Sequence, residues 1–425
     1  MKKLFVITIC IIFCANVLHS QTPYWKLAPR KMPLPVSGGQ AVYDITSGGT
    51  KVYILGGYSD SLQQTVDWIQ EYDAEADTWR MVGRMLQPRK QFVAGIWNGN
   101  VVYFGGALET SSAKTTLEIW NISSKLSPSI YDVIADFGRS FATGYVAGDN
   151  LYMFGGSPSA GGKISYIASY NLAAKKITWS FDFVSEEKPR EQMTFLVNNN
   201  IYVFGGAFNG IIDKIQRFDI PPQKGEFLNY KLLEKRAGGS AVYSTVHRKG
   251  FLIAGYNESN KALRTVEEII VYWDGSLKIT QMPSLRYARY NPMAVDYKGI
   301  IAVFGGKDSV GNVVPYVETL LSVQTDVKEV TTPYEFKLEQ NYPNPFNPST
   351  IISYTVPKQS RVQIKIYDVI GNEVRSLIDE DKNAGKYNIL WDSRNNTGSR
   401  VTSGVYLYKI FADGFTETKK MMLVK

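Results

Sequence analysis

The sequence predicts an all-β protein, in which a six-bladed β-propeller is followed by a β-sandwich. A strand-like motif ending in Gly-Gly returns about every fifty residues through the first three quarters of the chain. The last stretch of roughly ninety residues alternates short apolar strands with turns. Hydrophobic residues make up 44% of the 425 residues and aromatic residues 13%, which suffices for packed cores and argues against disorder.

The position of the diglycine defines the repeat. Its first residue falls at 56, 105, 155, 205, 254 and 305, so the steps are 49, 50, 50, 49 and 51 residues. Position 254 is Ala254, which makes the fifth copy degenerate. Each unit has room for four strands, and glycines allow tight turns between them, as in a propeller blade. We assign a structural role to the intact pairs, which are Gly56 and Gly57, Gly105 and Gly106, Gly155 and Gly156, Gly205 and Gly206, and Gly305 and Gly306.

Other features return in a fixed order within the units. A strand after the diglycine ends in an aromatic residue followed by Asp or Asn, as in Tyr72-Asp73 and Tyr170-Asn171, and Trp79 and Trp179 follow in two units. Over residues 22 to 325 these features resemble the kelch family, whose blade carries a diglycine, a Tyr-Asp and a spaced Trp. The resemblance implies a kelch-type β-propeller, which we place at residues 21–325. Blade five departs from the pattern at Ala254, and four blades lack the spaced Trp.

The ring closure is also predicted from the sequence. The segment 25–33 matches 79–88 with a slip of one residue, so Trp25 stands at an outer-strand position before the first blade begins. The sixth unit stops near Val323 without a clear outer strand of its own. We therefore expect the N-terminal strand to complete the last blade, which removes a free sheet edge.

The C-terminal region begins after a polar linker at 326–332. Prolines at 343, 345 and 348 favour an extended, turn-rich start. Seven short strands are expected at 334–339, 351–356, 362–367, 373–378, 387–391, 404–411 and 416–424, which together favour an immunoglobulin-like sandwich at 333–425.

The same region closely resembles the C-terminal sorting domain of type IX secretion cargo, with its motifs in the family's order. The matching motif residues are Asn341, Pro343, Pro345, Phe346, Gly404, Tyr406, Lys419 and Lys420. The resemblance implies that residues 333–425 are read by the secretion machinery, and we expect the Lys-rich final strand to be the part that is read. The alternative is an ordinary adhesive sandwich.

Residues 1–20 have the pattern of a signal peptide, with Lys2 and Lys3 before an apolar stretch and Ser20 before Gln21. An uncleaved anchor is the alternative, although the apolar stretch is short for a membrane span. Cys10 and Cys14 both lie in this segment, so the mature chain has no cysteine. We expect a secreted or outer-surface-attached protein, without a transmembrane span in the mature chain. Its modest positive charge, without a Lys/Arg block, argues against nucleic acid as a partner.

Most catalytic arrangements are excluded by composition. The mature chain has a single histidine, His247, and no cysteine, which argues against Ser-His-Asp and Cys-His catalysis and against metal sites built from several histidines or cysteines. The diglycines end strands and lead into strands, so they are not phosphate loops. We therefore predict no metal, no cofactor and no catalytic residue.

One set of candidate ligand-binding residues remains. Arginines recur before the blade glycines, sixteen residues before them at Arg89, Arg139 and Arg289, fifteen at Arg190 and eighteen at Arg236. In kelch propellers this loop opens on one end of the central channel. Five guanidinium groups at one funnel would suit carboxylates. The alternative is a structural role, in which the arginines pair with acids of a neighbouring blade, such as Glu118, Glu267 and Glu318.

Three functions are compatible with these observations. The first is a non-enzymatic module that binds a glycan or a protein at the arginine-bearing face. The second is an enzyme that acts through carboxylate and arginine alone; among kelch proteins a sialic-acid mutarotase is the example, and a channel Glu with a raised pKa would support it. The third is a structural adhesin. Absent catalytic constellations favour the binding module, so the protein is expected not to be an enzyme.

Overall fold

The computed structural model describes residues 23–44, 50–108, 113–158, 167–181, 189–197, 200–219, 225–272, 274–321, 336–341, 344–382 and 385–424. The chain divides into two compact units, Met1–Val323 and Gln324–Lys425. The predicted signal peptide and the predicted linker at 326–332 both lie outside the described residues. Within the ranges that are described, no helix is long and apolar enough to span a membrane.

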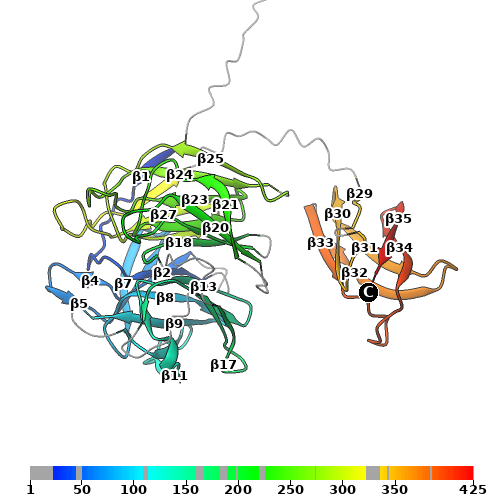
Figure 1. Ribbon diagram of the computed structural model, residues 1–425, viewed down its shortest axis with the longest axis horizontal. Helices are drawn as coiled ribbons and strands as arrows, with labels where there is room; N and C mark the ends of the chain where they lie inside the picture. Colours follow the sequence, from blue (N-terminus) through cyan, green and yellow to red (C-terminus); the bar gives the residue numbers. More distant parts are fainter. Residues whose placement is uncertain are drawn as a thin grey trace, which may run out of the picture. The chain divides into compact units, whose positions relative to one another are not determined.

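The first unit is a ring of six four-stranded antiparallel sheets, as the sequence predicts (Figure 1). The first three blades, each from its inner to its outer strand, are β2 (Gln40–Tyr43), β3 (Lys51–Leu55), β6 (Trp68–Asp73) and β7 (Thr78–Arg84); β8 (Lys90–Trp97), β9 (Asn100–Ala107), β10 (Thr116–Asn121) and β11 (Ser129–Val133); and β13 (Thr143–Ala147), β14 (Asn150–Phe154), β16 (Ile167–Asn171) and β17 (Lys176–Phe181).

The last three blades have the same strand order. They are β18 (Met193–Val197), β19 (Asn200–Phe204), β20 (Lys214–Asp219) and β21 (Gly225–Lys231); β22 (Ser240–Ser244), β23 (Lys249–Ile253), β24 (Val266–Val271) and β25 (Leu277–Met282); and β26 (Met293–Tyr297), β27 (Ile300–Phe304), β28 (Glu318–Leu321) and β1 (Tyr24–Leu27). Smaller pieces at the blade ends are β4 (Tyr58–Ser59) with β5 (Gln64–Thr65), β12 (Arg139–Ser140) with β15 (Ser157–Pro158), and the short helix η1 (Ala135–Phe137).

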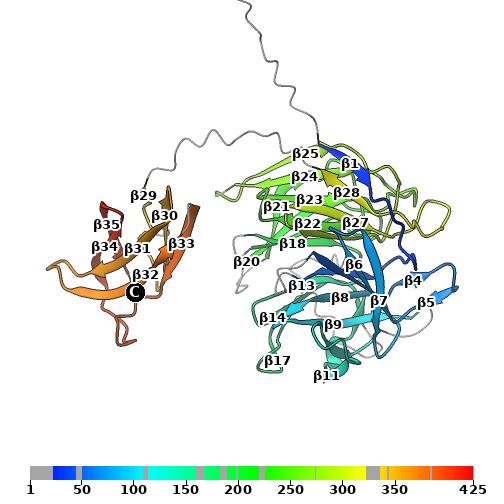
Figure 2. The ribbon, with the colours of Figure 1, turned by 180° about the vertical axis from the view of Figure 1, so that it is seen from behind.

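The prediction for ring closure is confirmed. Strand β1 pairs antiparallel with β28, with Trp25 opposite Leu320, and Figure 2 shows blue β1 beside yellow β28. The Trp25 indole Nε1 donates to the Pro283 carbonyl at 2.8 Å, which ties the same strand to blade five. The six inner strands also contact one another in sequence around the ring, including β2 with β26. The first strand of the chain thus covers the outer edge of the last blade.

The second strand of every blade is buried on both faces, because it lies between neighbouring blades. Residues Val52, Tyr53, Ile54 and Leu55 of β3, for example, are all buried. Apolar clusters fill the spaces between blades, and one of them joins Ile54 of the first blade to Phe304 of the last. This burial explains why the repeat appears in the sequence as a short, continuous apolar run instead of an alternating one.

The diglycines bring adjacent blades into contact. Gly56 has φ of 56°, and a Cβ there would lie 2.5 Å from the Arg89 carbonyl oxygen of the turn into the next blade. The Gly57 amide donates to that carbonyl at 2.9 Å. In the degenerate blade, Ala254 adopts the same left-handed conformation with φ of 60°, which costs a residue with a Cβ about 1–2 kcal/mol.

The second unit is a sandwich of seven strands, as the alternation predicts. One sheet has the order β29 (Lys337–Leu338), β30 (Thr350–Val356) and β33 (Gly385–Trp391); the other has β32 (Glu373–Lys382), β31 (Ser360–Tyr367), β34 (Gly404–Ala412) and β35 (Phe415–Leu423). Trp391 is buried in the core between them and contacts Phe346 and Tyr406. The Tyr406 hydroxyl donates to the Thr402 carbonyl at 2.7 Å, which fixes the start of β34.

The motif residues of this unit differ in exposure. Asn341, Phe346 and Tyr406 are buried, whereas Pro345, Gly404 and Lys420 are exposed and Lys419 is half-buried; Pro343 lies outside the described residues. Phe346 donates its amide to the Met422 carbonyl at 2.9 Å and accepts from the Val424 amide at 3.0 Å. The segment around Phe346 thus covers the outer edge of β35 and holds the end of the chain in the sandwich.

Candidate functional site

Four of the five candidate arginines lie in the interior of the propeller. Arg89, Arg236 and Arg289 are completely buried, and Arg139 retains 3% of its surface. Arg236 contacts Glu267 at 2.7 Å and Arg289 contacts Glu318 at 2.5 Å, and Arg89 is paired with Glu118. The expectation that these guanidinium groups face the funnel is therefore corrected. The terminal nitrogens of their guanidinium groups are hydrogen-bonded inside the protein, as the structural alternative proposed.

The glutamates also hold the turn between blades. Glu318 accepts the backbone amides of Arg286 at 2.6 Å and Tyr287 at 3.2 Å, in addition to the Arg289 guanidinium. Arg289 itself donates to the Gly305 and Tyr316 carbonyls at 2.9 and 3.1 Å. Each such pair connects the turn that enters a blade to the third strand of that blade. Satisfied hydrogen bonds of this kind are what allow an ion pair to be buried at low cost.

Arg139 shows what happens where the glutamate is missing. Sheet register places Ala168 at the position that Glu118, Glu267 and Glu318 occupy in blades two, five and six. Arg139 donates instead to the carbonyls of Phe137 and Gly155, both at 3.2 Å. Burial lowers the pKa of Arg139 to about 10. This arginine is therefore structural as well.

Arg190 is the exception, because it is exposed. Arg190 lies fifteen residues before the first blade glycine, Gly205, instead of sixteen. Pro189 therefore takes the buried position that an arginine occupies in four other blades, and Arg190 lies one residue further along the chain. Bridge pairs confirm the shift: Arg190 pairs with Ala207, as Ala237 pairs with Tyr256 and Tyr290 with Lys307. The Arg190 guanidinium carbon lies 5.8 Å from the centre of the Phe141 ring. Of the five candidates, it alone presents its guanidinium at the protein surface.

A closed ring of backbone hydrogen bonds surrounds the channel mouth. One residue from each blade, always with φ between 50° and 67°, donates its amide to the carbonyl of the equivalent residue in the preceding blade, at 2.6 to 3.1 Å. In blade order these residues are Gly38, Gln91, Phe141, Glu191, Gly238 and Asn291. These hydrogen bonds use the backbone amide and carbonyl groups of all six residues in the ring. Side chains are therefore the groups left to contact a ligand here.

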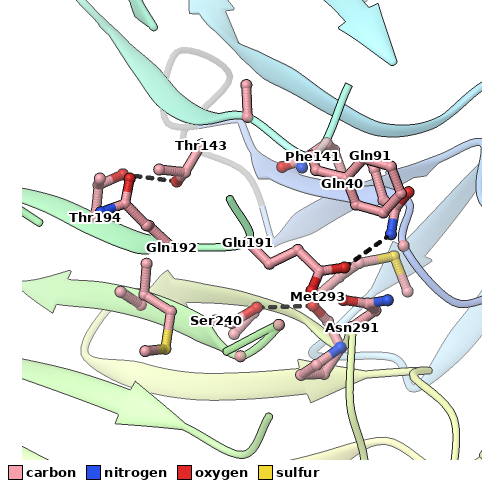
Figure 3. Close-up of a pocket in the computed structure, with 18 of the residues that line it drawn as sticks. Gln40, Gln91, Phe141, Thr143, Glu191, Gln192, Thr194, Ser240, Asn291 and Met293 are labelled. Carbon is pink, nitrogen blue, oxygen red and sulfur yellow. Dashed lines mark hydrogen bonds between the residues drawn. The ribbon is translucent and has the colours of Figure 1, made fainter. Parts of the chain in front are cut away.

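Beneath the ring lies a polar pocket of about 140 Å³, lined by all six blades (Figure 3). Glu191 reaches over it, and the Gln91 amide nitrogen lies 3.5 Å from the Glu191 carboxylate. The Tyr256 hydroxyl donates to the other carboxylate oxygen. Burial raises the pKa of Glu191, although the Tyr256 hydrogen bond and the charge of Arg190 oppose the shift. Sequence reasoning missed this residue.

Two further cavities open at the mouth. The arginine lobe, of about 450 Å³, is lined by Arg190, Phe208, Asn209, Tyr256 and Asn260, together with residues 156–157, Ala207 and 210–211. The lysine lobe, of about 330 Å³, contains Tyr58, Lys90, Tyr290 and Lys307, and shares Gly38, Gln91, Phe141 and Asn291 with the central pocket.

His247 does not line any of these three cavities. The His247 Nε2 atom contacts the Gly299 carbonyl at 2.6 Å, which suits a local structural role near the β22–β23 turn. No cluster of three or more His, Cys, Asp or Glu side chains able to hold a metal occurs in the ranges given above.

Comparisons with known proteins agree with this architecture. A family model for the Kelch motif matches residues 44–86, and one for the FlgD Ig-like domain matches residues 348–414. Among solved structures, the one reported as "Structure of YjhT" is similar at 15% identity and a TM-score of 0.57, covering 70% of this chain and 97% of that chain. At this identity the likeness concerns the fold. The protein is thus a kelch-type β-propeller followed by an immunoglobulin-like sandwich.

Proposed function

We propose that the propeller is a binding module that holds a carboxylate-bearing ligand, such as an acidic glycan or an acidic protein segment, at the channel mouth. The observation that carries this proposal is the exposed guanidinium of Arg190, at the edge of an open cavity. A planar guanidinium offers a carboxylate two parallel hydrogen bonds. The rigid backbone ring beneath it lowers the cost of ordering the site on binding.

The surroundings of Arg190 fit a polar ligand better than an apolar one. Tyr256 contributes a hydroxyl group, and Asn209 and Asn260 contribute exposed amides to the arginine lobe. Phe141 supports the guanidinium from the side of the central pocket. A sugar acid has the carboxylate and the hydroxyl groups that such a lobe would contact.

A thermal-shift panel on the mature chain tests the proposal, using galacturonate, glucuronate, N-acetylneuraminate, an acidic peptide and neutral sugars. A ligand present at a hundred times its dissociation constant should stabilise the propeller by about 2.7 kcal/mol. We expect the shift with an acidic ligand to disappear in Arg190→Ala. It should persist in Lys278→Ala, which removes an exposed cation from the outer strand β25. No shift with any acidic ligand would refute the proposal.

A second function is favoured by one observation, the raised pKa of Glu191 over the central pocket. A carboxyl group that keeps its proton above its ordinary pH range is suited to general acid catalysis. With Arg190 holding the substrate carboxylate, Glu191 would give its proton to the ring oxygen of a sugar acid as the bond from that oxygen to the anomeric carbon breaks. A water molecule would take the proton of the anomeric hydroxyl, which becomes the carbonyl of the open chain. Closure on the other face of that carbonyl would reverse both proton transfers and give the other anomer. The reaction would be the interconversion of anomers, as in a sialic-acid mutarotase.

Proton NMR of freshly dissolved N-acetylneuraminate distinguishes the two functions. Mutarotation predicts faster anomer exchange with the wild type, and a loss of that acceleration in Glu191→Gln while ligand-induced stabilisation remains. Because the acid must be protonated, the rate should fall as the pH rises through the raised pKa of Glu191. Exchange at the uncatalysed rate would leave binding without catalysis as the function.

We also propose that the protein is exported, with residues 1–20 as a signal peptide and residues 333–425 as a sorting domain read by a type IX secretion machinery. Lys420 is exposed on the last strand, whereas Phe346 is buried and is hydrogen-bonded through its backbone to Met422 and Val424 at the end of that strand. We therefore expect Lys419→Ala/Lys420→Ala to block export of a reporter fused to residues 333–425 without unfolding the sandwich. Unchanged export by the double variant would contradict recognition of this strand.

A further inference from the structure

We infer that the channel mouth takes up a proton from solution when it binds its ligand, because Glu191 becomes protonated as Arg190 receives the ligand carboxylate. Tyr256 is the positioning residue that holds Glu191 beside the arginine lobe. The affinity for the ligand therefore increases as the pH falls. This inference rests on the proposed function, since it concerns the same site, and it adds a regulation by pH that the proposed function does not contain.

Tyr256 connects the arginine lobe to the central pocket. It lines the arginine lobe, and its hydroxyl donates to the carboxylate of Glu191, which belongs to blade four. Blade five contributes Gly238 to the closed hydrogen-bonded ring, and a Cβ on Gly238 would lie 2.9 Å from the Cε1 atom of Tyr256. The Tyr256 side chain thus fills the space that a side chain at position 238 would take. On another side it packs edge-on against Tyr290, with ring centres 6.1 Å apart, so its hydroxyl is held at Glu191.

Glu191 is the one titratable side chain among the described residues that line the central pocket (Figure 3). The other polar side chains of this lining are neutral amides and hydroxyl groups, and they are Gln40, Gln91, Thr143, Gln192, Thr194, Ser240 and Asn291. The Gln91 amide lies 3.5 Å from one carboxylate oxygen, and Tyr256 is hydrogen-bonded to the other. Burial in such surroundings disfavours the charged form, so the pKa of Glu191 is raised.

Arg190 is the cation that opposes this effect. Its positive charge lowers the pKa of Glu191, against the larger effect of burial, and it acts in the same direction on Tyr256. The remaining charged or titratable side chains that line the three cavities belong to the lysine lobe and are Tyr58, Lys90, Tyr290 and Lys307. A ligand that neutralised one of these lysines would act on Glu191 in the same direction as one that neutralises Arg190, so the sign of the effect does not depend on them.

The effect of binding follows from these charges. A carboxylate held by Arg190 cancels the positive charge that favours ionised Glu191, and it brings a negative charge into the neighbourhood. Both changes disfavour the ionised form, so the pKa of Glu191 is higher in the complex than in the free protein. Between these two pKa values, binding takes up part of a proton from the buffer. Because coupling is reciprocal, the protonated protein binds the ligand more tightly.

Calorimetric titration of the mature chain with trigalacturonate between about pH 4.5 and 8, where a carboxylate of ordinary pKa stays ionised, tests this inference. Each pH is measured in two buffers that differ in ionisation enthalpy. The difference between the two apparent binding enthalpies then gives the number of protons taken up. The variants are Glu191→Gln, Tyr256→Phe, Arg190→Ala and the control Lys278→Ala, and their melting temperatures without ligand establish that they are folded.

We expect the wild type and Lys278→Ala to take up less than one proton per ligand and to bind about three- to tenfold more tightly at the acidic end of the range. Glu191→Gln should take up no proton, because its amide is neutral, and should bind at every pH as tightly as the wild type does at the acidic end. Tyr256→Phe removes a hydrogen bond that lowers the pKa of Glu191, so the pH dependence should move to higher pH.

The contrary results have separate meanings. Binding that depends on Arg190, but with one enthalpy in both buffers and one affinity at every pH, would refute proton uptake and leave the proposed function in place. Proton uptake that persists in Glu191→Gln would refute the assignment to Glu191. An unchanged pH dependence in Tyr256→Phe would refute the positioning role of Tyr256. Absence of binding by the wild type would refute both the inference and the proposed function.

Discussion

The buried pair of Arg289 and Glu318 allows a sharp test of how the blades are joined. Glu318→Ala removes the carboxylate and leaves a completely buried guanidinium without its charge partner. It also leaves the amides of Arg286 and Tyr287 without their acceptor. Removing one partner of a buried ion pair costs about 3–5 kcal/mol. For a domain of this size, the propeller should melt on the order of 5–10 °C lower.

Two comparisons separate the charge effect from simple loss of contacts. The double variant Arg289→Met/Glu318→Gln removes both charges but keeps an oxygen for the backbone amides, so it should lose only about 1–2 kcal/mol. Glu258→Ala breaks the exposed pair with Lys235, in which the Glu258 carboxylate and the Lys235 ammonium group lie 2.7 Å apart, and should leave the melting temperature almost unchanged. Differential scanning calorimetry at pH 7 measures all of them. A Glu318→Ala melting temperature within about 1 °C of the wild type would refute the structural role given to these arginines.

Three further predictions concern stability. Ala254→Gly should stabilise the propeller by about 0.5–1 kcal/mol in a thermal melt, because Ala254 is held at φ of 60°; a lower melting temperature would contradict this. Burial would raise the pKa of Glu71, but hydrogen bonds from Lys125 and Arg80 outweigh it and lower that pKa to about 2. The ionised Glu71 carboxylate therefore contributes up to about 3 kcal/mol to the free energy of unfolding above pH 4.5, and this contribution is lost as the pH falls toward 2. Glu71→Gln should abolish this part of the dependence of stability on pH, and identical acid-unfolding curves for the variant and the wild type would contradict the prediction. Trp25→Ala should lower the free energy of unfolding, measured by urea denaturation, by about 2 kcal/mol, whereas Tyr24→Ala, on the exposed side of β1, should change it little. Equal effects of the two substitutions would contradict ring closure through Trp25.

The blades themselves could be predicted because their signal is periodic. Each second strand is buried on both faces and must be apolar, and the first position of the diglycine adopts a positive φ in every unit, with glycine in five blades and Ala254 in the fifth. The same logic predicted that Trp25 belongs to the last blade. Seven strands in the sandwich followed from alternation and turn residues.

The candidate site was harder to predict, because spacing alone does not show where a side chain points. Arg89, Arg236 and Arg289 occur with glutamates thirteen residues after the first position of the blade diglycine, and this pairing is the sequence signal of a buried role. The spacing of Arg190, one residue shorter, was the signal of a different orientation.

Glu191 could not have been singled out by residue type. The residues at the equivalent positions are Gly, Gln, Phe, Glu, Gly and Asn, which share no chemistry. What they share is a left-handed backbone conformation and a place in a closed hydrogen-bonded ring. That ring exists only when all six blades have assembled, so it leaves no local pattern in the sequence.

The most direct test of the account is a calorimetric titration of the wild type, Arg190→Ala and Lys278→Ala with an acidic oligosaccharide such as trigalacturonate. A ligand site built around Arg190 predicts saturable one-to-one binding by the wild type and by Lys278→Ala, and loss of that binding in Arg190→Ala. Binding of equal strength by Arg190→Ala, or no heat with the wild type, would contradict a ligand site at the channel mouth.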